Sequence, residues 1–178
     1  MGMGILLCGL NGAGKTTLGK ALAENLGFHF IDSEDLFFPK ADPQPDYARP
    51  RKKEEARKLL LREIEFYQDF VLASVTGDFG EDFFCPFQLA VEITVPKELR
   101  MKRLRDRSFR QFGDSILPGG DRYEQEEEFF RFAESRAENT VESWLRTLPC
   151  PVLKIDGTKP IEENVLFLAE HIKGKMLP

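Results

Sequence analysis

The feature that most constrains how this chain folds is a glycine-rich octapeptide near its N-terminus, residues 9–16, with the sequence GLNGAGKT. It matches the pattern GxxxxGK[ST] at every fixed position. In such a loop the glycines let backbone N–H groups turn inward, and the start of the following helix adds a dipole that favours an anion. The octapeptide therefore predicts a phosphate-binding loop that joins a strand to a helix.

The residues on both sides of the octapeptide supply the context that this motif requires. A short apolar run, residues 5–8, precedes it, and Leu18, Leu22 and Leu26 follow at helical spacing up to Gly27, which suits a helix end. Residues 28–31 then predict a second strand. Strand, loop, helix and strand in about 30 residues form a βαβ unit, in which the two strands are parallel.

The rest of the chain continues this alternation. We expect strands over residues 70–75, 89–95 and 152–155, and helices over residues 51–68, 96–107, 121–145 and 161–172. Prolines interrupt residues 37–50, which predict a loop without regular structure. The alternation predicts one α/β domain, residues 1–178, with three layers: a parallel sheet and helices on both of its faces.

Composition and charge exclude several functional classes. The formal net charge is −5, from 30 acidic and 25 basic residues, whereas a nucleic-acid groove needs an excess of Lys and Arg. No apolar run reaches the roughly 18–20 residues that span a bilayer. Cys8, Cys85 and Cys150 lie far apart, without metal-ligand spacing. We expect a cytoplasmic monomer or weak homodimer with reduced thiols and no nucleic-acid or membrane partner.

The octapeptide also indicates which ligand the chain binds, namely ATP with Mg²⁺. Lys15 would bring a positive charge to the β- and γ-phosphate oxygens, and the Thr16 hydroxyl is placed to ligate Mg²⁺. From this motif, the expected nucleotide-binding residues are Gly9, Asn11, Gly12, Ala13, Gly14, Lys15, Thr16 and Thr17.

With its early motif, five strands and arginine-rich segment before a long helix, the chain resembles the small P-loop kinases of the adenylate kinase fold, including adenylate, shikimate and gluconate kinases. The resemblance covers nearly the whole chain. It implies a sheet in the order 2-3-1-4-5, an acceptor-binding segment over about residues 33–69 and a helical lid over about residues 108–122. It also implies that the backbone at Gly157 borders the adenine, although a strand-to-helix turn explains this glycine equally well.

The end of the second strand separates two branches of this family. Residues 30–36 read FIDSEDL, which is similar to the Asp-x-Asp of shikimate and gluconate kinases and unlike the Ser/Thr-x-Gly-Asp of nucleotide monophosphate kinases. An alcohol acceptor needs a carboxylate that orients it and accepts its proton, whereas carboxylates repel a phosphate acceptor. By this resemblance Asp32 would hold Mg²⁺ and act in catalysis, and Glu34 or Asp35 would contact the acceptor. Acidic capping of a helix is the alternative for these residues.

Two further pairs of residues are candidates for the acceptor site. Arg49 and Arg51 could clamp a carboxylate or a phosphate, but they also fit a solvated helix start, because the positive charge continues along the chain. Gly77 and Asp78 follow the third strand, in a sequence similar to the glycine-rich ending found in shikimate kinases. A plain turn explains this second pair equally well.

An arginine-rich helix follows the fourth strand. Arg100, Arg103 and Arg107 recur at spacings of three and four residues, and Arg110 comes next. Phosphoryl transfer spreads charge over the equatorial phosphate oxygens, so arginines that close over ATP would stabilise this charge and exclude water. The resemblance assigns this role to Arg107, Arg110 and, in the helix after the lid, Arg136. Surface ion pairs with the many nearby glutamates are the alternative for each arginine.

The sequence therefore predicts an ATP-dependent kinase that transfers the γ-phosphoryl group to a small molecule, with a hydroxyl favoured over a phosphate as the acceptor. Two other functions stay open. One is a nucleoside or nucleoside-monophosphate kinase, and the other is a P-loop ATPase that regulates a partner. The expected catalytic residues are Lys15, Asp32, Arg107, Arg110 and Arg136.

Overall fold

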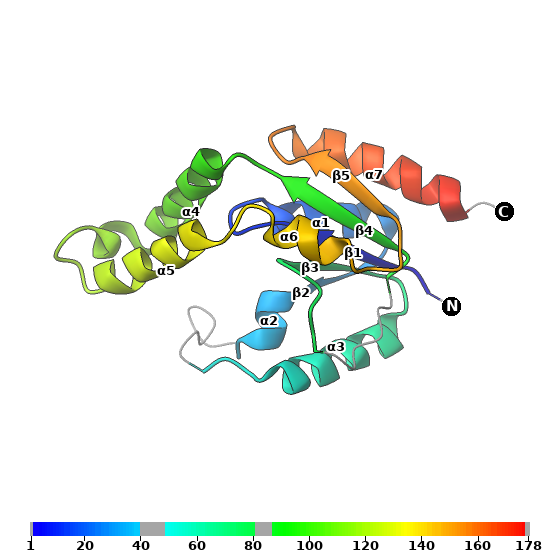
Figure 1. Cartoon of the computed structure of the whole chain (residues 1–178), viewed down its shortest axis with the longest axis horizontal. Helices are drawn as coiled ribbons and strands as arrows, with labels where there is room; N and C mark the ends of the chain where they lie inside the picture. Colours follow the sequence, from blue (N-terminus) through cyan, green and yellow to red (C-terminus); the bar gives the residue numbers. More distant parts are fainter. Residues whose placement is uncertain (1, 40–48, 81–86, 177–178) are drawn as a thin grey trace.

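The computed structural model describes residues 2–39, 49–80 and 87–176. Its centre is one parallel sheet of five strands in the order β2-β3-β1-β4-β5 (Figure 1). The strands are β1 (Gly4–Cys8), β2 (His29–Asp32), β3 (Phe70–Ser74), β4 (Leu89–Thr94) and β5 (Val152–Asp156). The predicted strand order 2-3-1-4-5 is confirmed.

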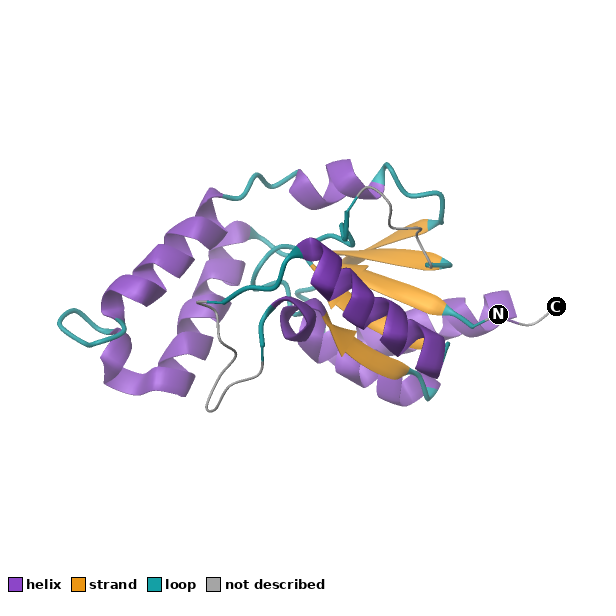
Figure 2. Cartoon of the chain, turned by 90° about the horizontal axis from the view of Figure 1, so that it is seen from below, coloured by secondary structure: helices purple, strands orange, loops and turns teal. Residues whose placement is uncertain are grey.

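Helices cover both faces of the sheet, as Figures 1 and 2 show. They are α1 (Lys15–Leu26), α2 (Ser33–Phe37), α3 (Lys53–Tyr67), α4 (Lys97–Phe112), α5 (Tyr123–Ser135), α6 (Thr140–Leu145) and α7 (Ile161–Met176). A 3₁₀ turn, η1 (Gly113–Ile116), follows α4. None of these described helices combines the length and the apolar composition needed to cross a bilayer.

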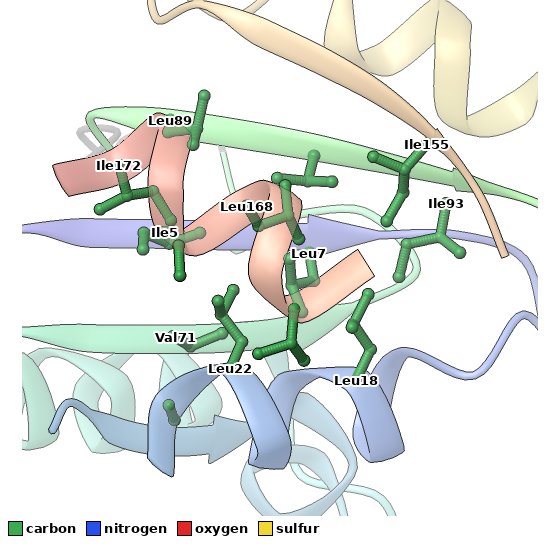
Figure 3. Packing of buried hydrophobic residues seen from close by; sticks show 14 of the residues in the cluster. Ile5, Leu7, Leu18, Leu22, Val71, Leu89, Ile93, Ile155, Leu168 and Ile172 are labelled. Atoms are coloured by element: carbon green, nitrogen blue, oxygen red, sulfur yellow. The ribbon is translucent and has the colours of Figure 1, made fainter. Parts of the chain in front are cut away.

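The two faces of the sheet bury two separate apolar clusters. Ile5 and Leu7 of β1 point to the face where α1 and α7 pack, with Leu22 and Leu168 among the buried contacts (Figure 3). The alternate residues of the same strand, Leu6 and Cys8, point to the other face, where α2, α3 and α6 contribute the buried Leu36, Leu60 and Leu145. Because side chains alternate along a strand, a wholly apolar strand is buried on both faces, and this produces the three layers.

Two of the three cysteines, Cys8 and Cys150, lie in the described residues. Cys8 is buried in β1, and burial raises the pKa of its thiol to about 12. Cys150 is half-buried. Cys85 lies outside the described residues.

One predicted helix, over residues 121–145, is wrong as a single element. The structure has two helices, α5 and α6, separated by residues 136–139, hereafter the connector, which begins with extended backbone at Arg136. The division arises because the apolar residues of the two helices belong to different cores. Phe130 and Ala133 of α5 pack on Leu104 of α4, whereas Val141 of α6 packs on the sheet.

Helices α4 and α5 form a hairpin that projects from the end of the sheet (Figures 1 and 2). Ser108, predicted as the start of a helical lid, lies inside α4, where it is buried and donates a 2.6 Å hydrogen bond to Glu126. Arg105 forms a 2.7 Å ion pair with Glu127. The segment from 108 is therefore α-helical as far as Phe112, and the 3₁₀ turn η1 continues it to Ile116.

Gly12 provides a test of how tightly the glycine loop is held in the fold. Its φ angle of 82° is left-handed, and a Cβ there would lie 2.5 Å from the carbonyl oxygen of Arg100. Gly27 has a similar φ of 71° but no atom within 4 Å of an added Cβ. We expect Gly27→Ala to lower the free energy of unfolding by about 1 kcal/mol through backbone strain alone, and Gly12→Ala by about 3 kcal/mol.

Denaturant unfolding of both variants and the wild-type protein measures this difference. The matched Gly27 variant removes the contribution of left-handed strain from the comparison. Equal losses in the two variants would show that the loop has room for a side chain at residue 12.

Candidate active site

The glycine loop lies between β1 and α1, at the carboxyl edge of the sheet, where ligands bind in folds of this class. Gly14 adopts a φ of 92° and caps α1, so that the helix begins at Lys15. The Ala13 N–H donates to the Leu10 carbonyl at 3.0 Å, which closes the loop as a tight turn. The backbone N–H groups at the start of α1 thus border an open cavity of about 370 Å³.

Most of the expected nucleotide-binding residues line this cavity: Gly12, Ala13, Gly14, Lys15, Thr16, Thr17 and, from the turn after β5, Gly157. Gly9 and Asn11 do not line it. A Cβ at Gly9 would lie 3.0 Å from the Ile93 carbonyl oxygen, so this glycine allows close packing against β4. The Asn11 carbonyl accepts a hydrogen bond from Arg100 instead.

Lys15 lies at the base of the loop, and its Nζ donates to the Leu10 carbonyl at 3.2 Å. Burial lowers the pKa of Lys15 to about 8, because the buried ammonium loses its hydration. Asp32 acts in the opposite direction, whereas the positive charges of Arg136 and Arg107 lower the pKa further. Residues from three distant segments therefore act electrostatically on one ammonium group.

Asp32 joins the end of β2 to the glycine loop. Its Oδ2 accepts a 2.8 Å hydrogen bond from the Thr16 hydroxyl, and its Oδ1 accepts a 3.0 Å bond from the Glu34 N–H. Asp32 thereby caps α2, so residues 33–37 are helical, as the capping alternative anticipated. A hydroxyl and a carboxylate in direct contact beside a phosphate loop are hard oxygen donors, and this donor set fits Mg²⁺.

The arginines of α4 face the same cavity from the opposite side. Arg103, Arg107 and Arg110 all line it, and Arg103 also donates to the Gly157 carbonyl at 3.1 Å. Arg107 and Arg110 are exposed side chains. The Arg110 Nε donates to the Asp106 carbonyl at 3.3 Å, within its own helix.

Arg136 lies in the connector and does not line the cavity, but its charge acts on Lys15. Its guanidinium carbon lies 4.8 Å from the centre of the Phe132 ring, and burial lowers its pKa. The Nε is buried and has no hydrogen-bond acceptor within the described part of the chain. The contact with the Phe132 ring orients the guanidinium, and its terminal nitrogens can then donate hydrogen bonds to a phosphate.

The acceptor candidates lie on the β2 side of the loop, in α2 and before α3. Glu34 is half-buried and Asp35 is exposed, both in the first turn of α2. The Arg51 guanidinium donates to the carbonyls of Asp35 and Leu36 at 3.1 and 3.0 Å, so it holds the end of α2. Arg49 is exposed beside residues 40–48, a part of the expected acceptor segment that lies outside the described residues.

The structure gives Gly77 and Asp78 packing and turn contacts. A Cβ at Gly77 would lie 2.7 Å from the Trp144 ring, which leaves space for glycine alone. Asp78 accepts a 2.6 Å bond from Lys53 and a 3.0 Å bond from the Gly80 N–H, and both bonds lower the pKa of its carboxyl group. These contacts favour the turn interpretation of this pair.

Sequence reasoning missed several residues that line the nucleotide cavity: Leu18, Ile93, Leu104, Lys159, Ile161 and Asn164. Asn164 donates to the Asp156 carbonyl at 2.9 Å, and Asp156 in turn accepts from the Thr158 N–H and hydroxyl. The polar sequence around Gly157 could have indicated that this turn borders the nucleotide. Asn164 could not be assigned to the cavity before the position of α7 was known.

Comparison with known proteins identifies the family. The AAA domain family (AAA_18) matches residues 5–138. The chain belongs to this family. The uncharacterized protein YqaC of Bacillus subtilis (strain 168) is 30% identical over 178 residues, covering 96% of this chain and 97% of YqaC. Shikimate kinase 2 of Yersinia enterocolitica is 64% identical, but over 33 residues only, 18% of each protein.

Solved structures similar to this chain have the same fold. Deoxyadenosine kinase from M. mycoides with bound dATP has a TM-score of 0.61 at 12% identity, covering 96% of this chain and all of that one. Shikimate kinase from Bacteroides thetaiotaomicron has a TM-score of 0.56 at 23% identity, covering 96% and 98%. The predicted fold is confirmed by these likenesses, and the match to the AAA domain family agrees with the predicted P-loop family.

The lowered pKa of Lys15 predicts how nucleotide affinity depends on pH. Below pH 8 the free protein already carries the charged ammonium, whereas above it a proton must be taken up on binding. We expect the dissociation constant for MgADP to be constant from pH 7 to 8 and then to rise about tenfold per pH unit. Isothermal titration calorimetry from pH 7 to 9.5 measures this dependence.

Lys15→Arg is the matched control for this titration. Its guanidinium stays charged throughout the range, so binding to this variant should be weaker but independent of pH. A wild-type affinity that does not change up to pH 9.5 would contradict the assigned titration.

Proposed function

We propose that this protein is a cytoplasmic, ATP- and Mg²⁺-dependent kinase that transfers the γ-phosphoryl group to a hydroxyl group of a small molecule. The observation that carries the proposal is the 2.8 Å contact between Thr16 of the glycine loop and Asp32 at the end of β2. It brings a nucleotide-side hydroxyl and an acceptor-side carboxylate to one point. The half-buried Lys15 and the α4 arginines lie around this point.

The nucleotide half of the site rests on the loop and on α4. The loop N–H groups and Lys15 bind the β- and γ-phosphates, and the base extends toward Gly157. Binding of dATP by the similar deoxyadenosine kinase supports a nucleoside triphosphate as the ligand. Thr16 and Asp32 would hold Mg²⁺, which when bound neutralises phosphate charge.

In the transfer step, the chain's own residues supply position and charge. Arg107, Arg110 and Arg136 stabilise the charge on the equatorial oxygens, and closure of the α4–α5 hairpin excludes water. Asp32 or its neighbour Asp35 orients the acceptor hydroxyl and receives its proton. Because Asp32 already accepts two hydrogen bonds, its carboxylate is held in one orientation relative to the loop.

The cations near the acceptor side favour a hydroxyl over a phosphate acceptor. Arg51 is bonded to two backbone carbonyls of α2, and Lys53 is paired with Asp78. Two of the positive groups that would otherwise hold an acceptor phosphate are therefore engaged within the protein. Glu34 and Asp35 add negative charge to the same side, which further disfavours a phosphate.

A nucleoside is a specific second candidate for the acceptor. The likeness to deoxyadenosine kinase over the whole of that chain favours it. A nucleoside presents a hydroxyl to the γ-phosphate, so the same carboxylate chemistry would serve. Shikimate, by comparison, is supported by fold likeness and by sequence matches that cover about a fifth of the chain.

An acceptor screen tests the proposal directly. ADP formation from MgATP is measured with sugar acids, polyols, nucleosides, aminoglycosides and nucleoside monophosphates, at saturating nucleotide. We expect stimulation by a hydroxyl compound and none by any monophosphate. Stimulation by a monophosphate would overturn the hydroxyl assignment, and slow hydrolysis that no compound stimulates would favour the regulatory ATPase.

Asp32→Asn tests the role of the carboxylate. We expect phosphoryl transfer to fall by about a hundredfold or more, while the affinity for nucleotide without metal stays close to wild type. Steady-state kinetics with the stimulating acceptor and fluorescence titration with nucleotide in EDTA measure the two effects.

Glu63→Gln is the matched control, because it makes the same carboxylate-to-amide change beside the opposite end of β2, where Glu63 contacts His29 at 2.8 Å. It should leave transfer unchanged. If Asp32→Asn keeps wild-type turnover, the carboxylate is not needed for the reaction.

A further inference from the structure

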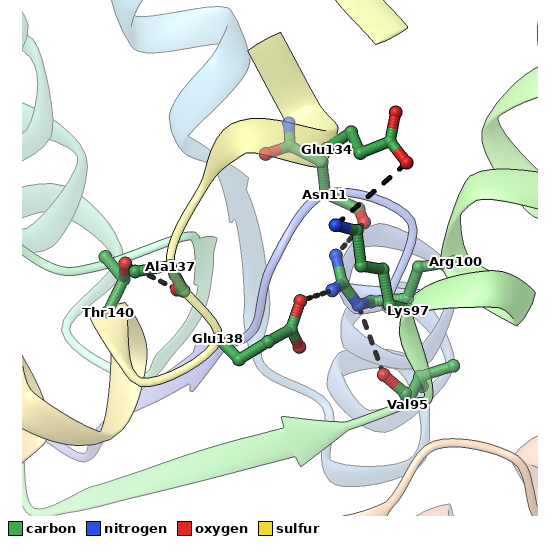
Figure 4. Close-up of polar contacts among 8 residues, drawn as sticks. All are labelled: Asn11, Val95, Lys97, Arg100, Glu134, Ala137, Glu138 and Thr140. Atoms are coloured by element: carbon green, nitrogen blue, oxygen red, sulfur yellow. Dashed lines mark hydrogen bonds and ion pairs between the residues drawn. The ribbon is translucent and has the colours of Figure 1, made fainter. Parts of the chain in front are cut away.

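A buried arginine at the start of α4 joins the glycine loop to the connector. The Arg100 side chain is 2% exposed, and all three of its nitrogens donate hydrogen bonds (Figure 4). Nε donates to the Val95 carbonyl at 3.1 Å, Nη1 to the Asn11 carbonyl at 3.3 Å, and Nη2 to the Glu138 carboxylate at 2.6 Å. One planar group thus links β4, the loop and the connector.

Glu138 is the one partner of Arg100 that is not needed to attach α4 to the rest of the fold. The contact with the Asn11 carbonyl already fastens α4 to the loop, the contact with the Val95 carbonyl fastens it to the segment after β4, and Gly12 packs against the Arg100 backbone. The Glu138 carboxylate is 58% exposed and reaches the guanidinium from the connector. A buried guanidinium attracts such a carboxylate strongly, because little water competes for it.

The connector carries Arg136 only two residues before Glu138. Two residues span at most about 7 Å of backbone, so fixing Glu138 restricts where Arg136 begins. The Arg136 side chain packs on Phe132, and its charge acts on Lys15. A weaker ion pair, Lys97 to Glu134 at 4.0 Å, links the same two parts of the hairpin one turn away (Figure 4).

We propose that the Arg100–Glu138 pair is a positioning device that holds the connector so that Arg136 lies beside the phosphate loop. Arg100, Glu138 and Arg136 are all outside the lining of the nucleotide cavity, and Arg136 is the residue of the three whose charge acts on Lys15, so the pair acts through Arg136. This inference rests on the proposed function, because it concerns the same site.

A double-mutant cycle tests it, with Glu138→Ala, Arg136→Ala and the combined variant. We expect Glu138→Ala to lower kcat about tenfold while the KM for ATP changes less than about twofold. In the Arg136→Ala background the same change should have an effect below about twofold, since the positioned side chain is absent. A purely stabilising role of Glu138 would instead lower the melting temperature and leave kcat unchanged.

Glu142→Ala is the control variant. Glu142 forms a 2.7 Å ion pair with Arg146 on the surface of α6, so its loss matches the loss of an ion pair without touching the connector. It should keep the wild-type kcat. Wild-type kcat in Glu138→Ala, or an equal loss with and without Arg136, would overturn the positioning role.

Amide hydrogen exchange separates this inference from the proposed function, because it needs no turnover. The Thr140 N–H donates to the Ala137 carbonyl, and the Ser143 N–H to Asn139. We expect Glu138→Ala to speed exchange at these amides about fivefold, while the exchange rates of the α7 amides stay unchanged. If no acceptor is phosphorylated, the proposed function fails alone, whereas unchanged exchange in Glu138→Ala overturns the role of the pair.

Discussion

The close packing of the glycine loop against the first turn of α4 is the contact on which both halves of the site depend. Gly12 approaches the Arg100 backbone at a distance that excludes a side chain, and the Arg100 guanidinium returns to bond the Asn11 carbonyl. The loop is therefore packed between the first turn of α4 on one side and α1 on the other. The arginines further along α4 inherit their position opposite the loop from this contact.

The same edge of the sheet brings the chemistry together. β1 and β2 are both parallel to β3, so the carboxyl ends of all three strands lie at one edge. This arrangement places Asp32 next to Thr16, sixteen residues away in the chain. The α4–α5 hairpin has its own small core around Leu104 and Phe130. The packing within the hairpin is thus separate from the two cores on the faces of the sheet.

The identity of the loop and the parallel direction of the strands were predictable because they depend on local signals, whereas the order of the strands was implied by the resemblance to the small P-loop kinases. A glycine pattern between an apolar run and an amphipathic helix has one common structural solution, and alternating strands and helices produce a parallel sheet. The individual arginines were not predictable in this way. Arg100, Arg103 and Arg107 share one helical spacing, yet Arg100 is a buried clamp, while Arg103 and Arg107 line the cavity. Helical periodicity predicts which residues lie on one face of the helix. It does not predict which of them pack against the neighbouring loop and which face the cavity.

The sequence by itself determined the phosphate loop, the three-layer fold and the acidic end of β2, because each is encoded within a few consecutive residues. Only the tertiary structure decided that Arg51 and Asp78 form hydrogen bonds within the chain and that α5 and α6 are separate helices. It also decided that Arg100 pairs with Glu138, 38 residues further along the chain. These outcomes depend on which polar groups become neighbours after the apolar faces are buried. A charged side chain bonds to the nearest partner that packing provides. In the glycine loop this is Arg100, which donates a hydrogen bond to the Asn11 carbonyl.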